Sequence, residues 1–254
     1  MKLTKHIHLI GSGRLGFNLS EELDCHVFLI ATDEDAVIID AGAGRTPQAT
    51  QMILDEIAGD GIDPTRISRL LLTHAHADHA GGAHALSERL GIQVLASATA
   101  ADYLRRGDEH AISLDRARIA GGYPTDYTYH ACPVATELAD AGGDRITVGD
   151  LELRSIATTG HCGGHLSFVL HHPDDASRID LFAGDAIFAG GSILLQDIWD
   201  CSVTESCRSV ERLAQIRPTG FFPAHGTFSI DRGWTHLEQA MTAMAGLLPP
   251  PQFG

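Results

Sequence analysis

A histidine-rich segment directly after an apolar run constrains this chain more than any other feature of its sequence. The apolar run Leu70–Leu72 is typical of a buried strand, and it is followed within a few positions by His74, His76, Asp78 and His79. Histidine and aspartate are the ligands that borderline divalent metals prefer, and the end of a strand is a rigid place to present them. The segment therefore predicts a metal site, rather than a polar surface loop that happens to be rich in histidine.

Three other apolar runs end in residues of the same kind. These residues are His161, Asp185 and His225, each within four positions of the end of a predicted strand. Metal sites commonly draw their ligands from strand ends that are far apart in the sequence. Four such ends in one chain favour a shared metal site over coincidence. With 15 histidines in the chain some coincidence is expected, and most of the other histidines do not follow a predicted strand in this way.

The composition excludes several classes of partner. With 18 Lys and Arg against 33 Asp and Glu, the formal charge is −15. An acidic surface repels phosphodiesters, so neither nucleic acid nor an anionic membrane is expected as a partner. Nothing in the sequence approaches the ~18 apolar residues of a membrane span. The five cysteines form no C-x-x-C pair and the first residues lack a secretory core, so we expect a cytoplasmic protein.

The order of the patterns predicts an α/β (α+β) protein with two similar β-rich halves. In each half an apolar hairpin with an acidic turn delivers an aspartate at its end, Asp40 in the first half and Asp185 in the second. Helices are predicted after Thr46-Pro47, from about residue 82 to 90, after the capping box Ser202–Glu205, and from about 232 to 248. We expect each sheet to be covered by helices on its outer face.

A glycine motif near the start resembles a dinucleotide-binding fingerprint. Gly11–Gly16 spells G-x-G-x-x-G, but too few residues separate it from the next strand to form the required helix. We therefore predict a turn between antiparallel strands.

Residues 102–143 show the least pattern of any segment. They contain four candidate pocket residues, Tyr123, Tyr127, Tyr129 and His130. Because long loops in compact domains tend to be functional, a pocket-forming insertion is favoured over ordinary loop and helix. We expect residues 1–254 to form one domain that carries this insertion.

Five motifs together resemble the metallo-β-lactamase superfamily. They are His74-x-His76-x-Asp78-His79, Gly81-Gly82, Thr159-Gly160-His161, Gly184-Asp185 and Pro223-Ala224-His225-Gly226, in the order of that family and with similar gaps. The resemblance runs from about residue 25 to 226. It implies a four-layer αββα sandwich, which agrees with the two halves inferred above.

The resemblance also implies a ligand set for two divalent ions. His74, His76 and His161 would hold the first metal, whereas Asp78, His79 and His225 would hold the second, and Asp185 would bridge them. Zinc is favoured, with manganese or iron as alternatives.

The chemistry implied by two such ions is hydrolysis. They would share a water whose pKa falls toward ~7, and the bridging hydroxide would attack a carbonyl group. Asp78 would orient the hydroxide or carry its proton to the leaving group. Asp40, Thr73 and His165 are expected to lie next to the ligand residues without binding metal, and to hold them in place. For Asp40 and Thr73, plain hydrogen bonding at a strand end is an equal alternative.

The substrate class is narrowed by His161-Cys162-Gly163-Gly164-His165, which resembles the glyoxalase II and thioesterase branch most closely. The stretch after Gly226 is too short for the helical domain with which glyoxalase II grips glutathione. Residues 186–200 lack the tyrosine of the related lactonases, and exported β-lactamases carry a signal that is missing here. We expect a hydrolase of a small ester, thioester or lactone.

Three alternative functions stay open. They are a mononuclear-iron persulfide dioxygenase, a β-lactam hydrolase and a non-catalytic metal-binding protein. The dioxygenases resemble the same superfamily but use only part of the ligand set. A small molecule is the expected partner, and the sequence leaves open a homodimer.

Overall fold

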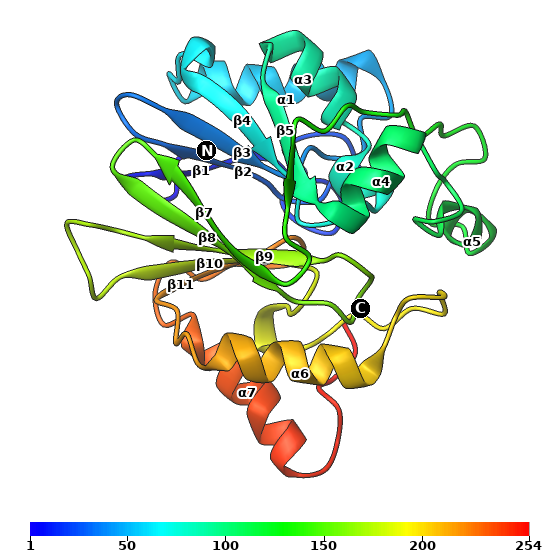
Figure 1. The fold of residues 1–254 in the computed structure, drawn as a ribbon, viewed down its shortest axis with the longest axis vertical. Helices are drawn as coiled ribbons and strands as arrows, with labels where there is room; N and C mark the ends of the chain where they lie inside the picture. Colours follow the sequence, from blue (N-terminus) through cyan, green and yellow to red (C-terminus); the bar gives the residue numbers. More distant parts are fainter. Residues whose placement is uncertain (254) are drawn as a thin grey trace. The chain divides into compact units, whose positions relative to one another are not determined.

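The computed structural model describes residues 1–253 and divides into two compact units, Met1–Leu138 and Ala139–Gly254. We call them the N-terminal unit and the C-terminal unit. Each contains one β-sheet, of six strands in the first and five in the second (Figure 1). Within residues 1–253, every helix is too short or too polar to cross a membrane.

The sheet of the N-terminal unit has its strands in sequence order. They are β1 (Ile7–Gly11), β2 (Val27–Ala31), β3 (Ala36–Ile39), β4 (Ile67–Leu71), β5 (Gln93–Ser97) and β6 (Thr136–Leu138). The first three pair antiparallel, whereas β3 to β6 pair in parallel. Strand β3 is buried along its whole length and reads as a continuous apolar run, as expected for a strand covered on both faces.

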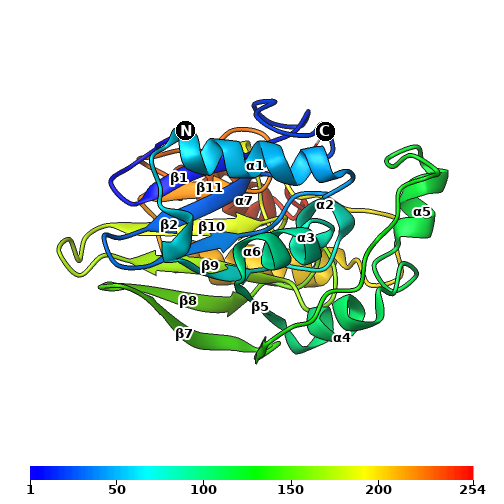
Figure 2. The same cartoon turned by 90° about the horizontal axis from the view of Figure 1, so that it is seen from above.

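Five α-helices and one 3-10 turn connect these strands. They are α1 (Pro47–Gly59), η1 (Pro64–Arg66), α2 (Ala77–Ala80), α3 (Ala83–Leu90), α4 (Ala98–Arg106) and α5 (Leu114–Ile119). Thr46 caps α1 by accepting a hydrogen bond from the Ala49 backbone N–H, and Pro47 occupies the first turn. Helices α1 and α3 lie over one face of the sheet (Figure 2).

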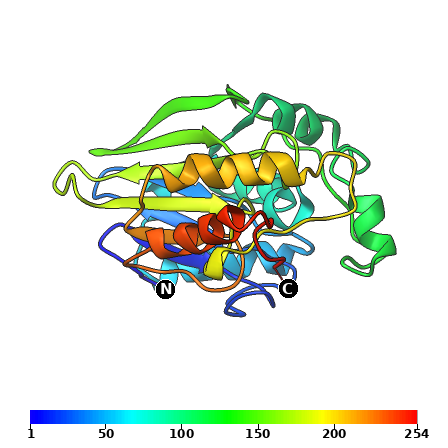
Figure 3. The same cartoon turned by 90° about the horizontal axis from the view of Figure 1, so that it is seen from below.

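The sheet of the C-terminal unit has the order β11-β10-β9-β8-β7. Its strands are β7 (Gly142–Val148), β8 (Leu151–Ala157), β9 (Leu166–His171), β10 (Ile179–Gly184) and β11 (Gly220–Pro223). Within this sheet β10 and β11 pair in parallel, whereas β7 with β8, β8 with β9 and β9 with β10 pair antiparallel. Helices α6 (Val203–Ala214) and α7 (Trp234–Ala245) run side by side across this sheet (Figure 3). The short 3-10 helix η2 (Ala189–Gly191) follows β10 in the chain.

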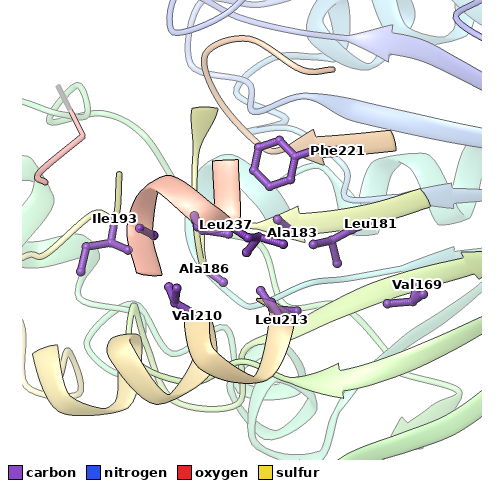
Figure 4. Packing of buried hydrophobic residues seen from close by; sticks show 11 residues of the cluster. Val169, Leu181, Ala183, Ala186, Ile193, Val210, Leu213, Phe221 and Leu237 are labelled. Carbon is purple, nitrogen blue, oxygen red and sulfur yellow. The ribbon is translucent and has the colours of Figure 1, made fainter. Parts of the chain in front are cut away.

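The core of the C-terminal unit lies between its sheet and these two helices (Figure 4). Leu181 and Phe221 contribute from β10 and β11, Val210 and Leu213 from α6, and Leu237 from α7. Burying one such side chain stabilises the fold by about 1.5–3 kcal/mol. This packing fixes the two strands whose ends carry Asp185 and His225.

The predicted mixed α/β fold with two similar halves is confirmed. Hairpin β2–β3 is followed by the parallel strand β4, and hairpin β9–β10 is followed by the parallel strand β11. Strands β1 and β2 pair antiparallel around the glycine motif, as predicted. The expectation of a single domain over residues 1–254 stays a prediction. Helices α4 and α5 and strand β6 were not predicted from the sequence.

Candidate metal centre

The histidine-rich segment of the N-terminal unit joins the end of β4 to the short helix α2. His76 precedes α2, and Asp78 and His79 lie in its single turn. His74 and His79 are fully buried. The ring centroid of His74 lies 4.6 Å from that of His76 and 4.0 Å from that of His79. Three imidazoles and a carboxylate gathered so closely provide donor atoms of the kind that a divalent cation prefers.

Asp40 orients one of these imidazoles. It follows β3 in a left-handed conformation with φ 62°, and it is buried. Its Oδ1 accepts a hydrogen bond of 2.8 Å from the Thr73 backbone N–H, and its Oδ2 lies 2.9 Å from His79 Nδ1. A carboxylate can only accept, so we assign the ring proton of His79 to Nδ1. The Nε2 lone pair of His79 is then available to a metal.

Thr73 extends the same arrangement to His74. Its hydroxyl oxygen lies 2.9 Å from Asp40 Oδ2 and 3.0 Å from His74 Nδ1. Because the hydroxyl has one proton and a carboxylate oxygen can only accept, Thr73 donates to Asp40 and accepts from His74 Nδ1. The Nε2 atom of His74 is thereby also left to act as a ligand.

The glycine pair after α2 is explained by close packing. The loop that follows Asp40 lies against the end of α2, where the Ala41 backbone N–H donates to the His79 carbonyl at 2.7 Å. A Cβ atom on Gly81 would overlap the Ala43 carbonyl and the Tyr127 hydroxyl. Only glycine therefore allows the loop and the helix to approach this closely.

The tyrosines of the predicted insertion contact the metal-binding segment. Tyr127 donates to the Ala43 carbonyl at 2.7 Å, and Tyr129 donates to the Ala75 carbonyl at 3.0 Å. Tyr123 donates to Asp78 Oδ1 at 2.8 Å, and burial together with the Asp78 carboxylate raises the pKa of its phenol well above the usual value. His130 is exposed. The assignment of these four residues to a substrate pocket stays a prediction.

Cys25 lies beside Asp40 and His79, a neighbour that the sequence analysis did not identify. One ligand-type atom from each of these three buried residues lies within 4.8 Å of the others. Burial raises the pKa of the Cys25 thiol to about 12, and His79 opposes this rise. The sequence carries no signal for this contact because Cys25 simply precedes an apolar strand.

The C-terminal unit gathers its three predicted ligands around Asp185. His161 Nε2 lies 3.5 Å from Asp185 Oδ2, and His225 Nε2 lies 3.6 Å from Asp185 Oδ1. These distances exceed a hydrogen bond. Two ligands held at ~2.1 Å on one tetrahedral ion lie roughly 3.4 Å apart. Each oxygen of Asp185 thus faces a different histidine at the spacing that a shared ion requires.

A pair of residues in the N-terminal unit has the same spacing. His79 Nε2 lies 3.6 Å from Asp78 Oδ2. The donor atoms in each unit therefore fit a divalent metal by chemistry and by spacing.

The orientation of His161 is set by a backbone carbonyl. Its Nδ1 lies 3.3 Å from the Leu194 carbonyl oxygen, which can only accept, so we assign the ring proton to Nδ1. The lone pair of His161 then lies on Nε2, the atom that faces the Asp185 carboxylate. The preceding Gly160 has φ 134°, and a Cβ atom there would overlap the backbone of Ser206 in α6. The helix and the ligand loop are thus packed directly against each other.

His165 is a hydrogen-bond partner of the Asp185 backbone, and its Nε2 lone pair is used in that bond. Its Nε2 accepts a hydrogen bond of 3.0 Å from the Asp185 backbone N–H. Its Nδ1 must then carry the proton, and it donates to the Thr158 hydroxyl at 2.9 Å. Thr158 in turn lies 2.8 Å from the Ser167 hydroxyl, which donates to the Ala183 carbonyl at 3.0 Å. The chain of bonds has one direction throughout, and every member is buried.

Comparison with known proteins identifies the family. The model of the metallo-beta-lactamase superfamily matches residues 21–225. The chain belongs to the metallo-β-lactamase superfamily. Among solved structures, a metallo-β-lactamase of Cronobacter sakazakii with a HARLDQ motif is 20% identical, with a TM-score of 0.72, over 97% of this chain and 96% of that one. The enzyme BJP-1 of Bradyrhizobium japonicum is 22% identical, with a TM-score of 0.66, over 88% and 86%. These similarities confirm the metallo-β-lactamase fold.

The matches to curated relatives cover a smaller share of each relative's own length. A hydroxyacylglutathione hydrolase of Methylococcus capsulatus is 29% identical over 72% of this chain and 58% of its own length. An atrochrysone carboxyl ACP thioesterase of Aspergillus fumigatus is 24% identical over 79% of this chain and 37% of its own length. A beta-lactamase-like protein 2 homolog of Drosophila melanogaster is 23% identical over 79% and 58%. The chain thus spans about half the length of these relatives.

Proposed function

We propose that this chain is a dinuclear metal-dependent hydrolase of a small ester, thioester or lactone. The proposal joins the donor atoms of the two units into one ligand set, following the order of the superfamily motifs. His74, His76 and His161 hold the first ion in this proposal, Asp78, His79 and His225 hold the second, and Asp185 bridges both.

The observation that carries the proposal is the environment of Asp185. A carboxylate that bridges through both oxygens presents each of them to a different metal position. Asp185 Oδ2 faces His161 and Asp185 Oδ1 faces His225, at 3.5 Å and 3.6 Å. The assignment of His161 to the first ion and His225 to the second is consistent with this division.

When bound, the two ions supply a water acidified toward neutral pH and a Lewis acid for the carbonyl oxygen. The residues of the chain have the task of preparing the donors. Asp40 and Thr73 keep the ring protons of His79 and His74 on Nδ1. Asp78 presents Oδ2 toward His79, and in this proposal it would also orient the hydroxide or carry its proton to the leaving group.

Thioesters are the favoured substrates among the three classes. Two of the named relatives are a hydroxyacylglutathione hydrolase and an ACP thioesterase, and both names describe acyl groups on a thiol carrier. His165, the second histidine of the motif that begins at His161, also resembles that branch. It holds the bridging residue in place by accepting a hydrogen bond from the Asp185 backbone N–H.

A substrate panel on protein of known metal content tests the proposal. The protein is loaded with two equivalents of zinc or manganese and assayed against esters, thioesters, lactones and β-lactams. We expect hydrolysis of at least one thioester, lost in His76→Ala and retained in His84→Ala, which removes an exposed imidazole from α3. A parent protein that binds two ions but hydrolyses no member of the panel would refute the catalytic proposal. One iron per chain with oxygen consumption would instead favour the persulfide dioxygenase.

A further inference from the structure

Three phenol hydroxyls of the predicted insertion donate to the segment that carries the N-terminal ligands. Two of them bind backbone carbonyls and therefore anchor the chain without touching a ligand side chain. These are Tyr127, which reaches Ala77 at 3.3 Å besides Ala43, and Tyr129, which reaches Ala75. Tyr123 is different because its acceptor is the carboxylate of Asp78.

The segment around Tyr123 is held by contacts that do not involve the Tyr123 hydroxyl. Arg118 forms two hydrogen bonds with Glu109, at 2.7 Å and 2.9 Å, and also donates to the Tyr127 carbonyl. Glu109 accepts from the Tyr129 backbone N–H at 3.1 Å. The Tyr123 and Tyr127 rings pack with their centroids 5.1 Å apart. Removing the Tyr123 hydroxyl therefore leaves the anchors of this segment in place.

The two carboxylate oxygens of Asp78 face different groups, and the Tyr123 hydroxyl contacts one of them. Oδ1 accepts from the phenol at 2.8 Å, whereas Oδ2 is the oxygen that lies 3.6 Å from His79 Nε2. A carboxylate that turns freely can offer either oxygen, or both, to a cation. A phenol donor on one oxygen holds the carboxylate plane and leaves the other oxygen to a metal shared with His79.

We propose that Tyr123 is a positioning residue for the second metal position, acting through the carboxylate of Asp78. This inference rests on the proposed dinuclear function and extends it to the insertion. It gives residues 102–143 a defined role, because the segment completes the surroundings of a ligand as well as any substrate pocket.

Metal titration of Tyr123→Phe tests this inference without relying on activity. Metal-free wild type and variant are titrated with zinc against a chromophoric chelator, so that two binding steps are resolved. We expect the second step to weaken by about 10- to 100-fold, the range typical for loss of a hydrogen bond to a metal ligand, and the first step to stay unchanged. Tyr103→Phe is the matched control, since Tyr103 on α4 stacks with Arg106.

A double-substitution cycle excludes a general loss of structure. In the Asp78→Ala background, Tyr123→Phe should change neither zinc step further, because the residue through which it acts is gone. Thermal unfolding of the metal-free variants monitors folding separately. A second step unchanged in Tyr123→Phe, or two steps weakened equally, would overturn the inference while the dinuclear proposal stands. A wild type that binds one ion would overturn both.

Discussion

Replacing Asp40 with asparagine should weaken metal binding while leaving the fold in place. Asparagine is the suitable replacement because the left-handed backbone at this position, with φ 62°, disfavours most other side chains. The amide keeps an oxygen for the Thr73 backbone N–H. It replaces the other carboxylate oxygen, which faces His79 Nδ1 at 2.9 Å, with an NH2 group.

The magnitude follows from the proton on His79. An amide NH2 is a donor, so His79 must accept at Nδ1 and move its own proton to Nε2, the atom that faces Asp78. The same substitution behind a catalytic histidine is known to preserve geometry while fixing the wrong tautomer. Loss of such a partner typically lowers metal affinity about 10- to 100-fold. This range corresponds to roughly 1.4–2.8 kcal/mol of binding free energy.

Zinc titration of the metal-free protein measures this effect, with thermal unfolding as the check on folding. Asp33→Asn is the matched control, because it removes the same charge from an exposed position in the β2–β3 turn. Asp40→Asn should lose affinity, and Asp33→Asn should not. Wild-type affinity in a folded Asp40→Asn protein would show that the tautomer of His79 does not govern binding, and the reasoning would fail.

Three further substitutions test other parts of the structure. His165→Phe leaves the Asp185 backbone N–H without its acceptor, so we expect unfolding free energy to fall by about 1–3 kcal/mol in denaturant titrations, with weaker zinc binding. Gly160→Ala should lower the melting temperature in calorimetry, because φ is 134° and the new Cβ meets the Ser206 backbone. Burial raises the pKa of Asp24 from its usual 3.8 to about 7. The folded protein then holds a proton that the unfolded chain releases, so stability falls as pH rises from about 4 to 7. Denaturant titrations should show wild type losing roughly 2–3 kcal/mol relative to Asp24→Asn between pH 5 and pH 8. Equal pH dependence of the two proteins would contradict the raised pKa.

The elements that bear the ligands could be predicted from the sequence because local signals mark them. Thr46-Pro47 predicted the start of α1, and Ser202 caps α6 by accepting from the Glu205 backbone N–H. Apolar runs located β4, β8, β10 and β11, and the residue types after each run indicated where ligands could lie. These signals act within a few residues, which is the range over which sequence patterns are informative.

The contacts that orient the ligands could not be predicted in the same way. The Leu194 carbonyl that orients His161 belongs to a loop, and any residue type supplies such an oxygen. Tyr123 lies 45 positions from Asp78, in the segment with the least pattern. Helix α4 was missed because Ala100, Ala101 and Leu104 form too short a buried stripe to stand out. Partners set by tertiary packing leave no periodic trace in the chain.

In each unit, a threonine within two residues of a strand end accepts a hydrogen bond from a histidine Nδ1, with different results. Thr73 follows β4 and accepts from His74 Nδ1 at 3.0 Å, and Thr158 follows β8 and accepts from His165 Nδ1 at 2.9 Å. A hydroxyl that donates onward, to Asp40 or to Ser167, is obliged to accept from the ring, so the lone pair is placed on Nε2. In His165 that lone pair is used at once by the Asp185 backbone N–H, whereas in His74 it is directed toward the proposed metal. A supporting histidine therefore differs from a proposed ligand in the group that faces its Nε2 atom. The spacing of histidines along the sequence does not reveal which group that is.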